Sequence, residues 1–204
     1  PEKEEFFCQR RSYLTTTWIS EDGEPVSKKI SIFGWVLLFS RGSAIIFVIL
    51  FGLILKFLLR VFEKPLFGAR RPVSPQITVM VSKISLWLLS IPVTRFGAPL
   101  KKPGAFVANH SSWLDIFALN SGHSLYFVSK SEVASWPGIG LLAKATGTLF
   151  IRRESKEAVA QKKLFGQRIK MGHRLLFFPE GTSTDGMRVL PFKSALFQAF
   201  FDSG

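Results

Sequence analysis

The feature that most limits the fold is a regular alternation of short apolar runs with helical patterns in the second half of the chain. The short runs predict strands, and the longer segments between them carry helical periodicity. The predicted strands are 105–109, 125–129, 148–151 and 174–178, and the predicted helices are 112–120, 138–145, 155–171 and 192–201. This alternation favours an α/β fold in which helices flank a mostly parallel sheet.

A long apolar segment, residues 30–62, precedes this region and is interrupted by Arg41, Lys56 and Arg60. A membrane-spanning helix needs about 20 apolar residues. Residues 43–62 reach that length only if Lys56 and Arg60, near one end, extend their side chains to the lipid head groups. Two interpretations stay open, a single spanning helix and a helical hairpin that enters one leaflet. We favour a single membrane anchor.

The predicted anchor divides the chain into three parts. Residues 1–29 form a polar leader, residues 30–75 the anchor with a basic linker, and residues 76–204 the α/β domain. The linker carries Lys64, Arg70 and Arg71. By the positive-inside tendency, these cations predict that the domain lies on the cytoplasmic face of the membrane. Helical spacing of apolar residues over 77–91 predicts a further amphipathic helix.

Composition narrows the class of partner. The formal net charge is +13, the pI is about 10.2 and the mean hydropathy is +0.24. Such a charge favours lipid head groups, phosphorylated substrates or nucleic acid. No nucleic-acid-binding motif accompanies the charge, so we do not expect a nucleic-acid partner. The single cysteine, Cys8, excludes an intramolecular disulfide, and no zinc-ligand spacing predicts a metal site.

The strongest candidate site begins at the end of the first predicted strand, where His110 is followed five residues later by Asp115. On one helix the two side chains would lie about 140° apart. If the strand ends before His110 and a helix starts near Ser112, Asp115 can hydrogen-bond the imidazole. The pair would then be a general base able to deprotonate an alcohol. Alternatively, Ser112 and Asp115 form a helix capping box. The residues alone leave both interpretations open.

Polar residues follow three other predicted strands. Arg152 and Arg153 end residues 147–153 and could bind an anion, although solvated surface charge explains most such pairs. Lys130 would add charge at the same edge of the sheet, or simply face solvent. After Phe177-Phe178-Pro179 come Glu180, Gly181, Thr182 and Ser183, which could bind a polyol or phosphate, or form a surface turn.

Together these motifs resemble the glycerolipid acyltransferases, the family of 1-acylglycerol-3-phosphate acyltransferases. Asn109-His110 through Asp115 is similar to the family's first motif, Gly147–Arg153 to its second, and Phe178–Ser183 to its third at every position. The resemblance covers roughly residues 76–204. A fourth motif is missing because the sequence ends at Gly204, so we expect the domain to be incomplete at its C-terminus. Residues 184–193 also resemble a branch that acylates lyso-ornithine lipid.

The resemblance implies acyl transfer from acyl-CoA or acyl carrier protein, as co-substrate, to the hydroxyl of lysophosphatidate, forming phosphatidate in phospholipid biosynthesis. It implies that His110 is the base, that Asp115 orients it, and that no metal or other cofactor is needed. Arg153, with Lys130, would bind the acceptor's phosphate, and residues 180–183 would line the glycerol site. The alternatives are O-acylation of lyso-ornithine lipid, an acyl thioesterase, and a non-catalytic lipid-binding module in the membrane.

Overall fold

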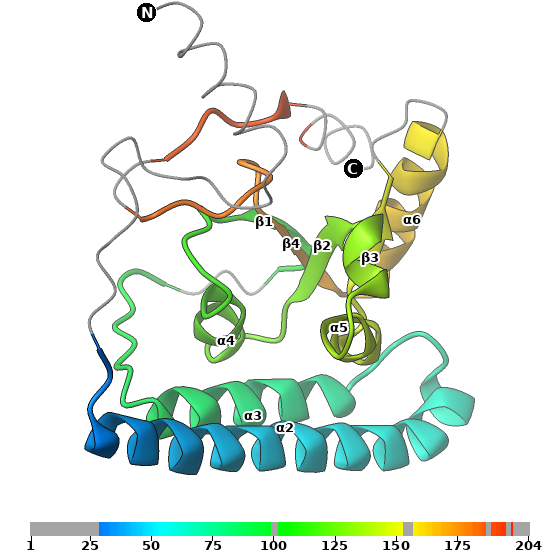
Figure 1. Cartoon of the computed structure of the whole chain (residues 1–204). Coiled ribbons are helices and arrows are strands. Elements are labelled where there is room, and N and C mark those ends of the chain that lie inside the picture. Colours follow the sequence, from blue (N-terminus) through cyan, green and yellow to red (C-terminus); the bar gives the residue numbers. More distant parts are fainter. Residues whose placement is uncertain (1–28, 99–101, 153–156, 187–188, 195–196, 198–204) are drawn as a thin grey trace, which may run out of the picture.

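The computed structural model describes residues 29–98, 102–152, 157–186, 189–194 and 197, so the predicted leader lies almost wholly outside the described residues. Its centre is a four-stranded sheet (Figure 1). The strands are β1 (Gly104–Val107), β2 (Tyr126–Lys130), β3 (Leu149–Ile151) and β4 (Arg174–Phe177). They lie in the order β1-β4-β2-β3, and every pairing is parallel. The predicted α/β fold with a parallel sheet is therefore confirmed.

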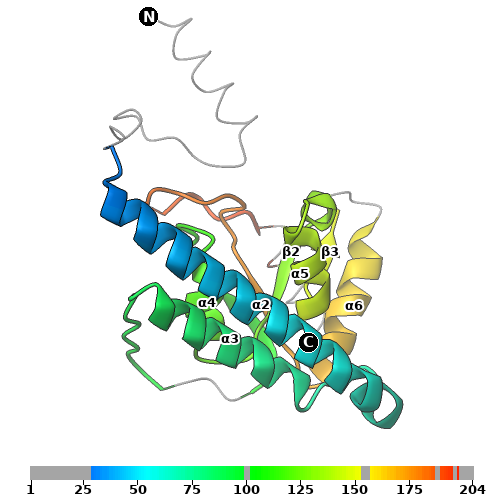
Figure 2. The ribbon, with the colours of Figure 1, turned by 60° about the horizontal axis from the view of Figure 1, so that its bottom comes forward.

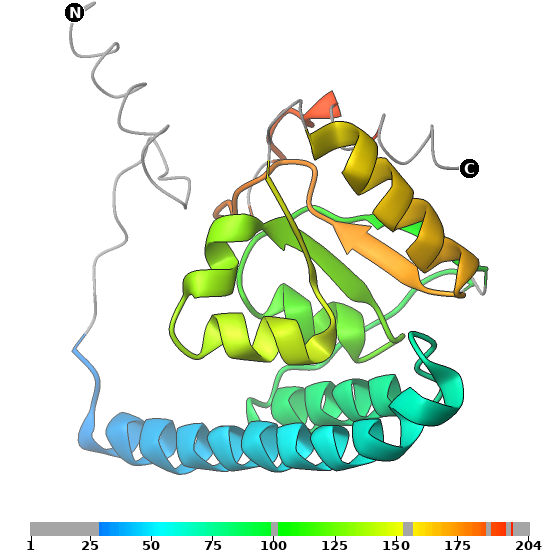
Figure 3. The ribbon, with the colours of Figure 1, turned by 90° about the vertical axis from the view of Figure 1, so that its right-hand side faces the viewer.

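Helices cover both faces of the sheet (Figure 3). They are α4 (Asp115–Asn120), the 3₁₀ helix η1 (Ser131–Ser135), α5 (Ile139–Thr146) and α6 (Ala158–Lys170). Because side chains alternate along a strand, Leu175 and Phe177 of β4 pack with Phe165 of α6, whereas Leu176 belongs to the opposite cluster, which Leu119 of α4 joins. Most of the predicted helix 192–201 lies outside the described residues.

Two further helices, α2 (Ile32–Phe67) and α3 (Ser74–Leu88), form an antiparallel pair that lies beneath the domain in Figure 1 and comes to the front in Figure 2. With 36 residues, α2 is about 54 Å long. It is long and apolar enough to cross a membrane, and most of its large apolar side chains are exposed. The two helices approach closely at Gly52, where an added Cβ would collide with Val81. The predicted anchor is thus a long helix paired over part of its length with a second, 15-residue helix.

The charged residues within the apolar segment do not behave as predicted. Lys56 was expected to extend to the head groups, but its side chain is 6% exposed and its Nζ donates a hydrogen bond to Thr78 Oγ1 at 2.6 Å. Arg60 pairs with Glu63 at 3.3 Å. The Glu63 carboxylate also accepts hydrogen bonds from the backbone N–H groups that begin α3. These groups face α3 because unpaired charge on the apolar face would be costly.

Candidate active site

The His110 side chain lies on the connection between β1 and α4, and Asp115 lies in the first turn of α4. The imidazole Nδ1 and the Asp115 Oδ2 are 2.7 Å apart. Both side chains are about one-fifth exposed, so the pair is partly shielded yet accessible. A carboxylate on Nδ1 fixes the tautomer in which Nε2 is the proton acceptor. The geometry is therefore that of a general base oriented by an acid.

Backbone amides hold the Asp115 carboxylate in place. Its Oδ2 accepts hydrogen bonds from the N–H groups of Ser111 at 2.8 Å and Ser112 at 3.0 Å. Burial by itself raises the pKa of Asp115, but the hydrogen bonds from Ser112, His110 and Ser111 outweigh it and lower that pKa below its usual value. The general-base and capping-box interpretations are thus compatible. The Asp115 carboxylate accepts the backbone hydrogen bond from Ser112 expected of a capping box and also orients the His110 imidazole.

Three residues after β4 hold His110 from its other side. The Glu180 Oε1 accepts a hydrogen bond from the His110 backbone N–H at 2.9 Å. The Thr184 backbone N–H donates to the His110 carbonyl at 2.8 Å. The Phe178 ring stacks on the imidazole, with centroids 4.0 Å apart and planes 12° apart. Since β1 and β4 are neighbours, the two connections meet at the carboxyl edge of the sheet.

Glu180 does not have the surroundings expected of a substrate-binding residue. Its side chain is 1% exposed, and its second oxygen, Oε2, accepts a hydrogen bond from the Leu190 backbone N–H at 2.9 Å. Both carboxylate oxygens are therefore engaged by backbone amides from two segments. Gly181 has a positive φ of 75°, which lets the chain turn immediately after this buried carboxylate. The contacts of Glu180 position His110 and the following loop.

The remaining predicted residues spread along the same edge. Lys130 ends β2, while Thr182 and Ser183 follow β4 and are partly buried. Arg152 follows β3 and lies 3.7 Å from Glu157. Arg153 lies outside the described residues. Three strand spacings, about 14 Å, separate β1 from β3, so a substrate contacting both would extend across the sheet edge.

Sequence reasoning missed two of the residues that hold His110. Phe178 was noted as part of a buried run and of the third motif but given no role beside His110, and Thr184 was not singled out although it follows the third motif directly. Hydrophobic patterning could not identify either role, because ring stacking and a backbone hydrogen bond depend on which strands are neighbours. Within the described residues, no group of three His, Cys, Asp or Glu side chains could hold a metal ion.

An α/β fold with an acid-oriented imidazole at the carboxyl edge of its sheet is typical of enzymes that use a general base. The acyltransferase family model matches residues 91–204. The chain is 50% identical over 187 residues to the lyso-ornithine lipid O-acyltransferase of Rhodobacter capsulatus, which covers 92% of this chain and 67% of that protein. The chain belongs to the acyltransferase family.

Other relatives match shorter stretches. The 1-acyl-sn-glycerol-3-phosphate acyltransferase of Neisseria gonorrhoeae is 39% identical over 109 residues, which are 52% of this chain and 43% of that protein. The crystal structure of the 1-acyl-sn-glycerophosphate acyltransferase from Thermotoga maritima superposes with a TM-score of 0.53 at 19% identity, covering 80% of this chain and 72% of that chain. This likeness confirms the fold.

Proposed function

We propose that the protein transfers a fatty acyl group from an acyl thioester to the free hydroxyl of lyso-ornithine lipid. The observation that carries the chemistry is the 2.7 Å contact between His110 and Asp115. The acceptor is suggested by the relative that is 50% identical over nearly the whole chain. The resemblance in the sequence favoured lysophosphatidate, and the more extensive match now favours the alternative acceptor.

In the proposed reaction His110 Nε2 takes the proton of the acceptor hydroxyl while that oxygen attacks the thioester carbonyl. The tetrahedral intermediate then expels the thiolate, which receives the proton from the imidazolium. An ester bond forms and a thioester bond breaks, and no acyl group is attached to the enzyme. Asp115 keeps the ring oriented and stabilises the positive charge that it transiently carries.

The acceptor's head group would bind along the sheet edge. We assign this role to Lys130, Arg153, Gly181, Thr182 and Ser183, whereas Glu180 acts as a positioning residue. A guanidinium binds the carboxylate of an amino-acid lipid as well as it binds a phosphate. Arg153→Ala should therefore raise the KM for the acceptor far more than the KM for the acyl donor. Equal increases would remove Arg153 from the acceptor site.

Lysophosphatidate is the second candidate acceptor, supported by the Neisseria relative. The proposed donor is acyl-CoA or acyl-loaded acyl carrier protein, and the proposed reaction uses no metal. We place the catalytic domain at the cytoplasmic face of the membrane, where the basic turn between α2 and α3 suits an anionic surface.

The decisive experiment offers lyso-ornithine lipid and lysophosphatidate together with acyl-CoA or acyl-loaded acyl carrier protein and detects products by mass spectrometry. The proposal predicts ornithine lipid as the main product. Phosphatidate as the main product would establish the second candidate. Equal release of free fatty acid with and without acceptor would instead identify a thioesterase. Binding of lysolipid without turnover would identify a lipid-binding module.

A further inference from the structure

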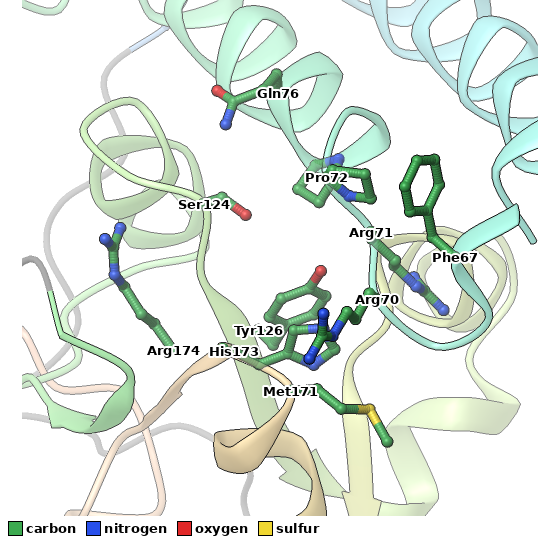
Figure 4. A pocket seen from close by; sticks show the side chains of 12 residues that line it. Phe67, Arg70, Arg71, Pro72, Gln76, Ser124, Tyr126, Met171, His173 and Arg174 are labelled. Carbon is green, nitrogen blue, oxygen red and sulfur yellow. The ribbon is translucent and has the colours of Figure 1, made fainter.

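A second polar site lies at the opposite end of the sheet. A cavity of about 460 Å³ opens between the α2–α3 turn and the amino ends of β2 and β4. Figure 4 shows Tyr126, Ser124 and Arg174 from the sheet side, and Arg70 and Arg71 from the turn. His173 precedes β4 and Phe178 follows it, so about 16 Å of strand separates this pocket from the His110 site.

The pocket is cationic. Arg70, Arg71 and Arg174 line it, and no carboxylate is among the described lining residues. Among the described residues, the carboxylate that acts electrostatically on Arg71 is that of Glu63. Its carboxylate is occupied by Arg60 and by the backbone amides that begin α3. The described residues therefore balance the positive charge of the turn only in part.

Within the described residues, buried polar atoms at the pocket and beside it make no hydrogen bond. The His173 side chain is 5% exposed, and within the described residues neither ring nitrogen makes a hydrogen bond. The Nε atoms of Arg71 and Arg168 are likewise buried without a partner there. Arg168 lies over the Tyr126 ring, 4.9 Å from its centroid, and the same ring packs against His173. Unsatisfied buried donors are costly, and an anion in the pocket can accept hydrogen bonds from Arg71 Nε and from the one N–H of the neutral His173 ring.

We propose that this pocket binds the phosphate of an anionic membrane phospholipid. The pocket adjoins the apolar face of α2, because Phe67 both lines it and is half exposed, while Phe62 and Leu66 nearby are more exposed still. A lipid can place its head group among the arginines and its chains along this face, which a free phosphate ion cannot do. The site is separate from the acyl-transfer centre, and its occupancy is measurable without donor or acceptor.

The test compares binding of the full chain to phosphatidylcholine vesicles with and without phosphatidylglycerol, by flotation. Arg70→Gln and Arg71→Gln should each weaken binding to the anionic vesicles roughly tenfold or more. Tyr126→Phe, which leaves the charge unchanged, should weaken it roughly two- to tenfold. The matched control, Lys64→Gln, removes an exposed cation of α2 outside the pocket. It should weaken binding to the anionic vesicles about fivefold, as expected for any cation near a membrane.

Arg71 packs close to Gly147 and Tyr126, so its variant is checked by thermal unfolding without lipid, and the exposed Arg70 keeps the test valid if Arg71→Gln misfolds. If Arg70→Gln and Lys64→Gln weaken vesicle binding equally and Tyr126→Phe does not weaken it, the proposed site is wrong and the binding is non-specific electrostatic attraction. Inorganic phosphate is the second probe. If it stabilises the protein in an Arg70-dependent way while vesicle binding is insensitive to Arg70→Gln, the lipid assignment is wrong.

Discussion

The two ends of the sheet hold histidines in opposite surroundings. At the carboxyl end, His110 lies 2.7 Å from a carboxylate and is partly exposed. At the amino end, His173 is buried, and burial followed by the charges of Arg168 and Arg71 lowers its pKa to about 4. An imidazole near a carboxylate and solvent can accept a proton from a substrate, whereas one buried among cations stays neutral. The comparison shows that the partner, and not the residue type, decides which histidine can act as a base.

The largest expected effect is on the partnered histidine. His110→Ala should reduce acyl transfer roughly 10²- to 10⁴-fold, because the general base is lost. Initial rates with saturating donor and acceptor measure this. His123→Ala, a substitution in the α4–β2 connection, is the matched control and should retain activity. Near wild-type turnover by His110→Ala would eliminate the proposed base and with it the contrast between the two ends.

The next effect concerns the acid. Asp115→Asn keeps an oxygen for the Ser111 and Ser112 amides but removes the charge beside the imidazolium. Activity should fall about tenfold to a hundredfold with the fold retained. Asp115→Ala also leaves those amides without an acceptor, so it should in addition lower the unfolding free energy by about 1–3 kcal/mol. Equal stability of the two variants would show that the amide contacts contribute little.

Glu180 tests whether the loop after β4 supports His110. In the folded protein the two Glu180 oxygens accept hydrogen bonds from the backbone N–H groups of His110 and Leu190. Glu180→Gln replaces one of these oxygens with an NH₂ group, so that two donors face each other. The unfolding free energy should fall by about 1–3 kcal/mol. Glu157→Gln, at an exposed ion pair, should change it by less than about 0.5 kcal/mol. Urea unfolding in detergent measures both. If Glu180→Gln leaves the unfolding free energy unchanged and raises the KM for the acceptor, Glu180 is a substrate-binding residue.

The last prediction concerns the pH dependence of stability that arises from His173. Its pKa is lowered to about 4 in the fold from 6.5, so between these values the unfolded chain binds a proton that the folded protein does not. Stability therefore falls as the pH decreases through this window, by about 2 kcal/mol between pH 7 and pH 5. We expect His173→Phe to lose this pH-dependent contribution. The measurement is the change in unfolding free energy between pH 7 and pH 5, which should be smaller in the variant by about 2 kcal/mol. An unchanged difference would place His173 in contact with solvent or an acid.

Local patterns were sufficient where a structure depends on neighbours in sequence. Three of the four predicted strands end within one residue of the observed ones, and His110 and Asp115 meet because only a short turn separates them. The surroundings of Lys56 and Glu180 could not be predicted, for the converse reason. Each is buried by a partner distant in sequence, Thr78 for Lys56 and the His110 backbone for Glu180.

The α/β alternation, the long apolar helix and the spacing that lets an imidazole meet a carboxylate could all be predicted from local patterns, since they follow from periodicity and local chain geometry. Three features needed the folded chain: β4 lies beside β1, α3 covers the polar side of α2, and the basic turn faces the amino ends of the strands. Strand order and helix pairing depend on burying surfaces far apart in the chain. No local pattern encodes which of those surfaces will meet.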